Sequence, residues 1–338
     1  RNVVQGDGIA FNPGEPTYGF TSPLWLFIIA VGGKMGVDLY LAAKAIDLVF
    51  ASLALIVLYL LAFEILRDVG VALCATVAFS VNAWFLRWAG SGMETSLAVL
   101  LTLVTILFCL RNEYFTAVVF AGLLTLTRPE GVFAVAVIAA DLFLNSHNKQ
   151  RALKMVVSLL IIYAVLMAPW LVYASATFGT VIPNTALGKV GWNFTAGDAL
   201  TTLRDLLQTL AAADAAACVV FLAAGVLLLL QFRRFRQNRR NAAESGGENA
   251  VAERGTYLGR QSLAGVVWVT GLALFYVASG TNVVSRYLLM TTPLITIYAF
   301  SFLFELLSLS AWRRRAHIGV IVLTALIMLQ NQLFYHRY

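Results

Sequence analysis

The chain has 338 residues, of which 60% are hydrophobic and 12% are charged, and its mean hydropathy is +0.81. Soluble domains carry about 25% charged residues, so this composition excludes a soluble globular domain and predicts an integral membrane protein. The net charge of +7 does not indicate a nucleic-acid partner, because the basic residues gather in short clusters between apolar segments. Cys74, Cys109 and Cys218 each lie inside an apolar run and predict neither a disulfide framework nor a metal site.

The first distinctive stretch is 6–25, with the sequence GDGIAFNPGEPTYGFTSPLW. Its glycines and prolines exclude a continuous helix, the NPGE tetrapeptide predicts a turn, and the Ser-Pro step predicts a helix start. Aromatic residues such as Tyr18 and Trp25 favour an ordered segment at the membrane interface, and an ordinary loop is the alternative. The apolar run 24–31 is shorter than the roughly 20 residues of a span, so we expect it to lie at the outer interface.

Ten later apolar segments have the composition of membrane-spanning helices, although several are short. They are 43–66, 71–85, 96–110, 114–126, 132–144, 155–173, 216–230, 263–278, 287–307 and 318–329. Segment 201–213 is mildly amphipathic and is expected on the membrane surface. The expected fold class is therefore an all-α polytopic membrane protein with about ten transmembrane helices and interfacial helices in the outer loops.

We expect three parts along the chain. Residues 1–42 form an outer loop with an interfacial helix, 43–331 form the transmembrane bundle, and 332–338 begin an outer C-terminal segment. Within the bundle lie a second outer loop at 174–198 and a basic cytoplasmic loop at 232–260. The chain starts on a polar segment with no visible signal peptide, so an upstream part is expected.

The basic clusters predict the orientation. Placing 6–25 outside and alternating the spans puts most Lys and Arg on the inner face, as the positive-inside rule requires. The inner clusters are Arg67, Arg111, 145–154, 232–260 and 313–315. The expected location is the plasma (inner) membrane, with the polar loops on the periplasmic or extracellular face.

A small set of charged residues remains on the outer side, mostly within a few residues of a span. The set is Asp7, Glu15, Arg87, Glu94, Arg128, Glu130, Lys189, Asp198 and Arg286. Snorkelling to the headgroups explains each one singly. Three arginines, however, recur at the outer ends of distant spans, and converging guanidinium groups suit a phosphate. Glu94 lies on a first helical turn, where the macrodipole stabilises a carboxylate, and Glu130 is a possible partner of Arg128.

The two outer loops are expected to face each other above the bundle. Aromatic rings stack on sugars, and amide and hydroxyl groups form hydrogen bonds with sugar hydroxyls. The expected substrate-contacting residues are Asn12, Tyr18, Trp25, Asn184 and Thr185. The expected phosphate ligands are Arg87, Arg128, Lys189 and Arg286. Together with the apolar helices below, these residues predict a site for a lipid-phosphate-linked sugar.

Five motifs in order carry a resemblance to a known family. They are FNPGEPTYGFTSPLW at 11–25, SGMET at 91–95, TRPEG at 127–131, FGTVIPNTALGKVG at 178–191 and SRYLL at 285–289. The chain resembles the C-type superfamily of integral-membrane glycosyltransferases (GT-C), in the branch related to the mycobacterial terminal β-arabinofuranosyltransferase and other bacterial polyprenyl-phosphate-sugar transferases. The resemblance covers nearly the whole chain and implies a GT-C-like helical bundle. It is more specific to the superfamily than to one sugar.

The resemblance implies transfer of a sugar from a polyprenyl-phosphate donor to an acceptor hydroxyl on a cell-envelope glycan, lipid or protein. It also implies inversion at the anomeric carbon and a carboxylate base. The family position of that base would precede Arg1, so Asp7 and Glu15 are the candidates within the chain, and Glu94 matches a functional acidic residue. Arg286 lies where relatives hold the donor phosphate, and Arg128 lies where they carry a basic turn.

Two other classes of function stay open. A polytopic lipid or solute transporter or flippase predicts broken helices, charges near mid-membrane and internal repeats, and no repeat is evident. A structural membrane subunit predicts small-residue packing faces and no collection of outer arginines. No cofactor is expected, because His147, His317 and His336 are scattered, although a divalent ion on the outer carboxylates stays open.

Overall fold

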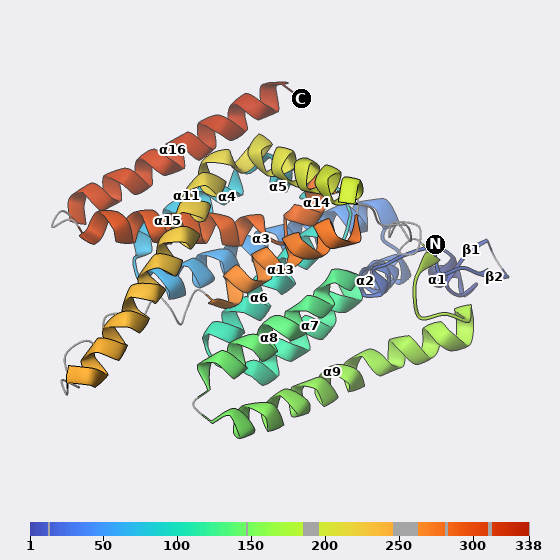
Figure 1. Cartoon of the computed structure of the whole chain (residues 1–338). Coiled ribbons are helices and arrows are strands. Elements are labelled where there is room, and N and C mark those ends of the chain that lie inside the picture. Colours follow the sequence, from blue (N-terminus) through green and yellow to red (C-terminus); the bar gives the residue numbers. More distant parts are fainter. Residues whose placement is uncertain are drawn as a thin grey trace.

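The computed structural model describes residues 1–337 except 13, 147, 185–195, 246–262, 281–282 and 310–312. This part of the chain is almost entirely helical, with one short hairpin (Figure 1). The expected all-α class is therefore confirmed. Among these residues, four helical stretches are long and apolar enough to cross a membrane: α3 (Leu39–Leu66), α9 (Lys149–Phe178), Gly197–Ala223 of α11 (Ala196–Ser245) and Ala316–Tyr335 of α16 (Arg313–Arg337).

The expected number of ten spans is not confirmed, because the other helices are shorter. They are α1 (Asn2–Gln5), α2 (Pro23–Lys34), α4 (Val69–Ser80), α5 (Ala83–Trp88), α6 (Thr95–Leu110), α7 (Tyr114–Thr127), the 3-10 turn η1 (Pro129–Gly131), α8 (Val132–Asn145), α13 (Leu263–Ser279), α14 (Ser285–Leu288) and α15 (Thr292–Leu309). Helix α6 is buried over most of its length and α15 over its first half (292–300), and both contribute to the centre of the bundle.

Two expected spans are each divided into two helices. The segment 71–85 breaks between α4 and α5, because the Asn82 side chain accepts hydrogen bonds from the backbone N–H groups of Trp84 and Phe85, both at 3.0 Å. An asparagine in this position starts a new helix. The segment 287–307 is divided likewise into the short α14 and the longer α15.

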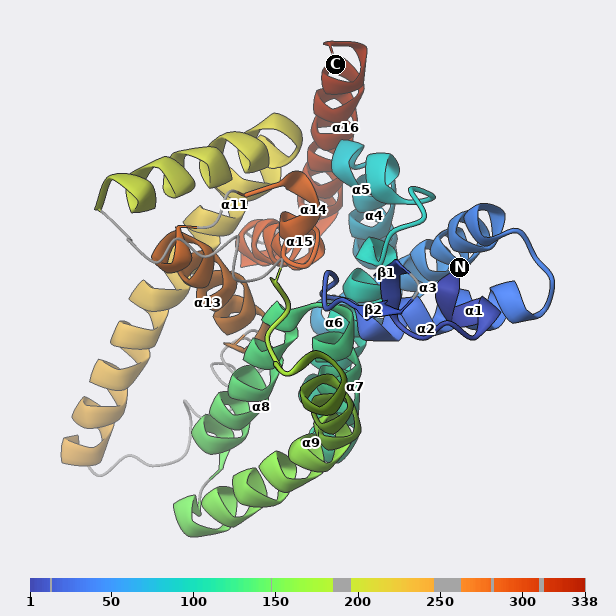
Figure 2. The same cartoon turned by 90° about the vertical axis from the view of Figure 1, so that its right-hand side faces the viewer.

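The first loop (residues 6–25) is ordered. Strands β1 (Ala10–Asn12) and β2 (Glu15–Pro16) pair in antiparallel fashion, so the expected turn closes a hairpin. Helix α2 then begins at Pro23, as the sequence predicts, although Ser22 makes no side-chain capping bond. We call this end of the bundle the hairpin end; Figure 2 looks onto it, with the hairpin and α14 facing the viewer.

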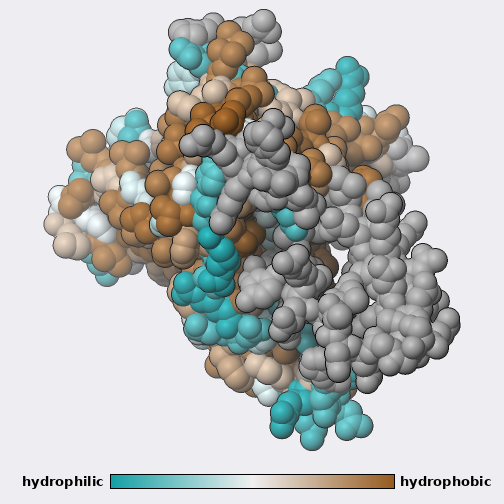
Figure 3. All heavy atoms as spheres, turned by 90° about the vertical axis from the view of Figure 1, so that its left-hand side faces the viewer, coloured by the Kyte–Doolittle hydropathy of each residue, from teal (hydrophilic) through white to brown (hydrophobic). Residues whose placement is uncertain are grey.

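The surface of the long helices is apolar. Figure 3 shows the end opposite the hairpin, where hydrophobic residues cover much of the described surface and hydrophilic ones form a narrow central band and scattered patches around the edge. Apolar side chains are exposed along all three of α3, α9 and α16. Examples are Leu53, Ile56, Leu160, Ile161, Val165, Ile321 and Val322. Such an apolar exterior is suited to contact with lipid tails rather than water.

At the end opposite the hairpin, Asp68 joins three helices. Its side chain accepts a hydrogen bond from the Val71 N–H at the start of α4 and lies 3.2 Å from His317 Nε2 of α16. Burial alone raises the pKa of Asp68, but these hydrogen bonds outweigh it and lower the pKa below its ordinary value. The carboxylate therefore stabilises this corner in its charged form.

Candidate functional site

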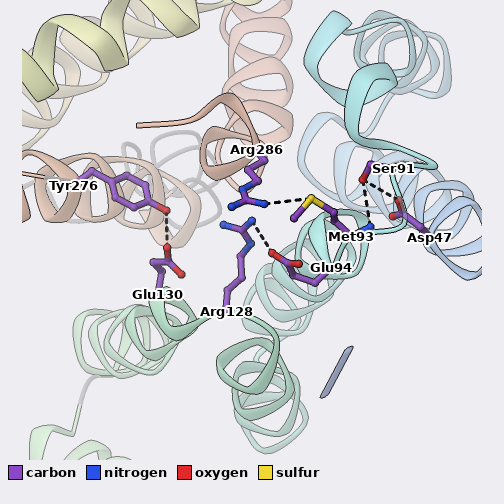
Figure 4. A network of polar contacts seen from close by, with 8 residues as sticks. All are labelled: Asp47, Ser91, Met93, Glu94, Arg128, Glu130, Tyr276 and Arg286. Atoms are coloured by element: carbon purple, nitrogen blue, oxygen red, sulfur yellow. Dashed lines mark hydrogen bonds and ion pairs between the residues drawn. The ribbon is translucent and has the colours of Figure 1, made fainter. Parts of the chain in front are cut away.

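Polar side chains from α6, α7, η1, α13 and α14 meet at the hairpin end (Figure 4). Arg128 ends α7, since the following Pro129 disfavours a helical conformation at residue 128. The next glycine, Gly131, lies so close to α7 that any side chain there would collide with the backbone of Leu124 and Thr125. The TRPEG sequence thus turns the chain sharply and fixes Arg128 at the end of the helix.

Arg128 forms an ion pair with Glu94. Its Nη2 lies 3.0 Å from Glu94 Oε1, and the two side chains are only 4% and 12% exposed. Burial alone lowers the pKa of Arg128, but the Glu94 and Glu130 carboxylates outweigh this effect and raise the pKa, so the guanidinium stays charged. The sequence suggested Glu130 as its partner. Instead, Glu130 Oε1 accepts a hydrogen bond from the Tyr276 hydroxyl at 3.4 Å.

Arg286 has a different environment. Its guanidinium lies 5.7 Å from the centre of the Trp88 ring and 5.4 Å from that of Tyr287. Its Nη1 donates to Met93 Sδ at 3.2 Å, and its Nε is buried with no hydrogen-bond acceptor among the described residues. Within that same part of the chain no carboxylate pairs with Arg286. Aromatic rings and a thioether therefore hold this charge.

The two guanidinium groups are neighbours. Arg128 also lies over the Tyr287 ring, at 5.0 Å, and Figure 4 shows the two side chains pointing toward each other from opposite sides. We call Glu94, Arg128, Arg286 and Tyr287 the arginine cluster. Neighbouring cations repel each other unless an anion lies near both. Glu94 forms an ion pair with only one of the two arginines, Arg128.

Asp47 supports the cluster and was not among the residues that the sequence suggested. It lies in α3, is fully buried, and accepts hydrogen bonds from the Gly92 N–H at 3.1 Å and the Ser91 hydroxyl at 3.5 Å. Ser91 Oγ in turn accepts from the Met93 N–H at 3.3 Å. Asp47 thereby anchors the turn that carries Met93 and Glu94. A carboxylate inside an apolar run was the available signal, because such residues are costly in a membrane.

Several other expected site residues make no hydrogen bond or ion pair with the cluster among the described residues, although Arg87 shares the Trp88 ring with Arg286. Asp7 and Glu15 are exposed, and Glu15 Oε2 accepts a hydrogen bond from Asn12 Nδ2 at 3.4 Å across the hairpin. Arg87 is also exposed and lies over the rings of Trp84 and Trp88 at 5.9 and 6.0 Å. Thr185, Lys189 and His147 fall outside the described residues.

The first loop meets the chain that follows α9. Tyr18 is buried, its hydroxyl accepts a hydrogen bond from Trp170 Nε1 at 3.0 Å, and burial raises its pKa. Its carbonyl accepts a hydrogen bond from the Asn184 N–H at 3.0 Å, and the Asn184 side chain stays exposed. Leu126 packs against the same group of residues, two positions before Arg128. The first loop and the described residues up to Asn184 of the second loop therefore lie at the end that holds the arginine cluster.

The remaining suggested residue, Trp25, is partly buried and packs against Phe50, with 6.3 Å between ring centres. It therefore helps to fix α2 against α3. As for metals, the described residues include no group of three or more His, Cys, Asp or Glu side chains that could hold an ion.

The fold and this cluster define an all-α membrane protein that gathers two arginines and a carboxylate at one end of its helices. No protein-family model, curated protein or solved structure matches the chain. The chemistry of the arginine cluster is therefore the observation that bears most directly on function.

Proposed function

We propose that the protein is a membrane glycosyltransferase of GT-C type in the plasma membrane. It would transfer a sugar from a polyprenyl-phosphate donor to a hydroxyl of a cell-envelope glycan, lipid or protein at the outer face. The observation that carries the proposal is Arg286, which is partly buried between two aromatic rings and has no carboxylate partner among the described residues. Leaving a buried charge uncompensated is unfavourable, and a bound phosphate removes that cost.

The surroundings favour a phosphate that is attached to a lipid. Arg286 and Arg128 present guanidinium groups from opposite sides, and planar guanidinium groups bind phosphate oxygens in pairs. Apolar helices lie directly below, so an isoprenoid tail would remain in an apolar environment. The first loop and the described start of the second loop, up to Asn184, lie at the same end and carry amide and hydroxyl groups that suit a sugar. The resemblance to the GT-C superfamily supports the same conclusion.

The transfer itself breaks the bond between the anomeric carbon and the phosphate oxygen. The acceptor oxygen forms a bond to that carbon from the opposite face, which inverts its configuration, and its proton passes to a carboxylate. Polyprenyl phosphate leaves with its negative charge next to the two arginines. Asp7 and Glu15 are the candidate bases within the chain, as the resemblance implies, and neither forms an ion pair among the described residues.

One observation favours a lipid or solute transporter as the second candidate. Helix α11 leaves helical geometry at Asp214, inside the spanning stretch Gly197–Ala223. Asp214 is buried, its Oδ1 accepts a hydrogen bond from Asn82 Nδ2 at 2.8 Å, and its Oδ2 has no partner among the described residues. Broken helices and buried carboxylates are typical of transporter substrate sites.

The test is binding of polyprenyl phosphate to the full chain in nanodiscs, measured by native mass spectrometry. We expect Arg286→Ala to weaken binding about 10–100-fold, because a hydrogen bond to a charged group contributes about 1.5–3 kcal/mol. Arg111→Ala is the matched control, since Arg111 is exposed at the end opposite the hairpin. Equal binding by the wild type and Arg286→Ala would refute the proposed phosphate site.

A second measurement separates the two candidate functions. The protein is supplied with polyprenyl-phosphate sugar and a glycan acceptor, and both the released polyprenyl phosphate and the extended acceptor are quantified. Sugar transfer that depends on Arg286 supports the transferase. Movement of the intact donor between leaflets of a vesicle, without transfer, supports the transporter.

A further inference from the structure

The two arginines of the cluster are not equivalent. Arg128 has a carboxylate partner at 3.0 Å, whereas Arg286 has none in the described part of the chain. A phosphate that binds between the two guanidinium groups must therefore approach a cation that is already paired. Glu94 and the incoming anion therefore compete for Arg128, and this competition affects how tightly the site holds polyprenyl phosphate, the product of the proposed transfer.

We infer that Glu94 is an internal counter-ion that exchanges with phosphate at Arg128. This inference rests on the phosphate site proposed above. In the empty site Glu94 neutralises Arg128; in the occupied site the phosphate bridges Arg128 and Arg286, and the Glu94 carboxylate moves away. When the lipid phosphate departs, the carboxylate returns, so Glu94 weakens product binding and speeds product release.

The geometry of the pair permits such an exchange. A single contact joins the two groups, Nη2 to Oε1, and Arg128 Nε is buried without an acceptor among the described residues. A guanidinium carries five N–H donors, so Arg128 retains donors for a second anion. Because Arg128 is 4% exposed, it needs a counter-ion in either state, and removal of Glu94 without replacement leaves a buried charge unpaired.

Glu94 also has a second favourable position available. It is the N-cap residue of the sixteen-residue helix α6, yet its side chain makes no capping hydrogen bond. A carboxylate displaced from Arg128 lies next to the free N–H groups of the first turn, where the positive end of the helix dipole stabilises it. Asp47 fixes the backbone of the preceding turn through Gly92, so only the side chain has to rotate.

The test compares dissociation constants of the wild type and Glu94→Gln in nanodiscs. Glutamine keeps the shape and an acceptor oxygen but has no charge, so it no longer competes effectively with a phosphate. We expect Glu94→Gln to bind polyprenyl phosphate about tenfold more tightly and to release it more slowly, the size expected for one charge-assisted hydrogen bond. The gain should disappear in the Glu94→Gln, Arg128→Gln double variant.

The outcomes distinguish this inference from the proposed function. If the wild type binds polyprenyl phosphate through Arg286 but Glu94→Gln binds equally or less tightly, the exchange is refuted and the phosphate site stands. If the wild type shows no binding that depends on Arg286, the phosphate site and the exchange both fail. Should Glu94→Gln not fold, Glu94→Asp retains the charge with a shorter reach, and we expect a smaller gain in the same direction.

Two further probes identify the source of the anion. Inorganic phosphate and phosphatidylglycerol nanodisc lipid are tested beside polyprenyl phosphate. If Glu94→Gln binds both inorganic phosphate and polyprenyl phosphate more tightly than the wild type, the result supports exchange of one anion for another. If it binds only polyprenyl phosphate more tightly, the result supports a lipid carrier as the occupant. If Glu94→Gln binds phosphatidylglycerol more tightly but neither inorganic phosphate nor polyprenyl phosphate, the inference is overturned, because the occupant would then be an ordinary bilayer headgroup.

Discussion

Asn331 offers the sharpest prediction about what holds the bundle together at the hairpin end. It lies in α16, is 2% exposed, and connects three helices through its side chain. Its Oδ1 accepts from the Ala83 N–H at 2.8 Å, and its Nδ2 donates to the carbonyls of Ala213 at 3.0 Å and Ile327 at 2.9 Å. Ala83 starts α5, and Ala213 directly precedes the break in α11. The variant Asn331→Leu removes all three hydrogen bonds while keeping a similar volume.

Two effects set the expected loss of unfolding free energy: the lost side-chain hydrogen bonds and the backbone groups that are left without partners. Side-chain hydrogen bonds inside membrane proteins average about 0.6 kcal/mol each, so three of them set a lower limit near 2 kcal/mol. Two buried backbone groups, the Ala83 N–H and the Ala213 carbonyl, also lose these partners, and an unsatisfied buried group costs about 1–3 kcal/mol. The second effect is the larger one, and we expect Asn331→Leu to lower the free energy of unfolding by about 3–5 kcal/mol.

The assay is unfolding by sodium dodecyl sulfate titration, followed through tryptophan fluorescence, in the same mild detergent for every variant. Gln332→Ala is the control, because Gln332 is the neighbouring residue on α16 and is exposed. It should stay within about 0.5 kcal/mol of the wild type, as surface substitutions usually do. If the free energy of unfolding of Asn331→Leu changes no more than that of the control, the argument that this side chain satisfies the backbone groups of Ala83 and Ala213 is refuted.

Three further predictions concern other parts of the fold. Gly265→Ala should destabilise the protein strongly, because its new methyl group would collide with the Tyr298 side chain. Gly271→Ala on the same helix is the control, because its methyl group would enter open space and should leave stability unchanged. Thermal unfolding in detergent compares the two variants. Trp170→Phe keeps a ring but removes the indole donor to the first loop, so hydrogen–deuterium exchange in that loop should become faster while the bundle is unchanged. Asp68→Asn should be less stable than the wild type at neutral pH, and the difference should vanish as pH falls through the lowered pKa of Asp68, because the stabilising carboxylate is then protonated.

Much of the helical layout could be predicted from composition alone. Apolar runs ending at charged or turn-forming residues gave the helices α3, α6 and α7 to within a few residues, and Pro23 gave the start of α2. The sequence also separated 201–213 from 216–230, and α11 leaves helical geometry between them at Asp214; however, 201–213 belongs to the candidate spanning stretch Gly197–Ala223, so its expected position on the membrane surface is not confirmed. Membrane-spanning length was harder to predict, because hydrophobicity marks a buried helix of 14 or 16 residues as readily as a spanning one.

The pairing within the site could not be predicted, for a physical reason. Glu94 and Arg128 are 34 residues apart, and they meet only because α6 and α7 pack side by side. Glu130 is closer to Arg128 in sequence, but its side chain reaches Tyr276 instead. The arginines themselves stood out, since a charge at the end of an apolar run is conspicuous. Asp47 did not, because one carboxylate among many apolar residues changes the average hydropathy little.

The break in α11 bears on the choice between the two candidate functions. A transporter would leave the carbonyl groups of a broken helix open to a substrate or ion. Here the carbonyls before Asp214 already accept hydrogen bonds: Gln330 Nε2 donates to Ala211 at 3.0 Å, and Asn331 Nδ2 donates to Ala213 at 3.0 Å. A cation would first have to displace both amides. The carbonyl groups before the break therefore have amide donors, although Asp214 Oδ2 has no partner among the described residues, whereas in the arginine cluster a cationic side chain, Arg286, has no counter-ion in the described structure. That contrast favours the arginine cluster as the ligand site and the α11 break as a structural joint.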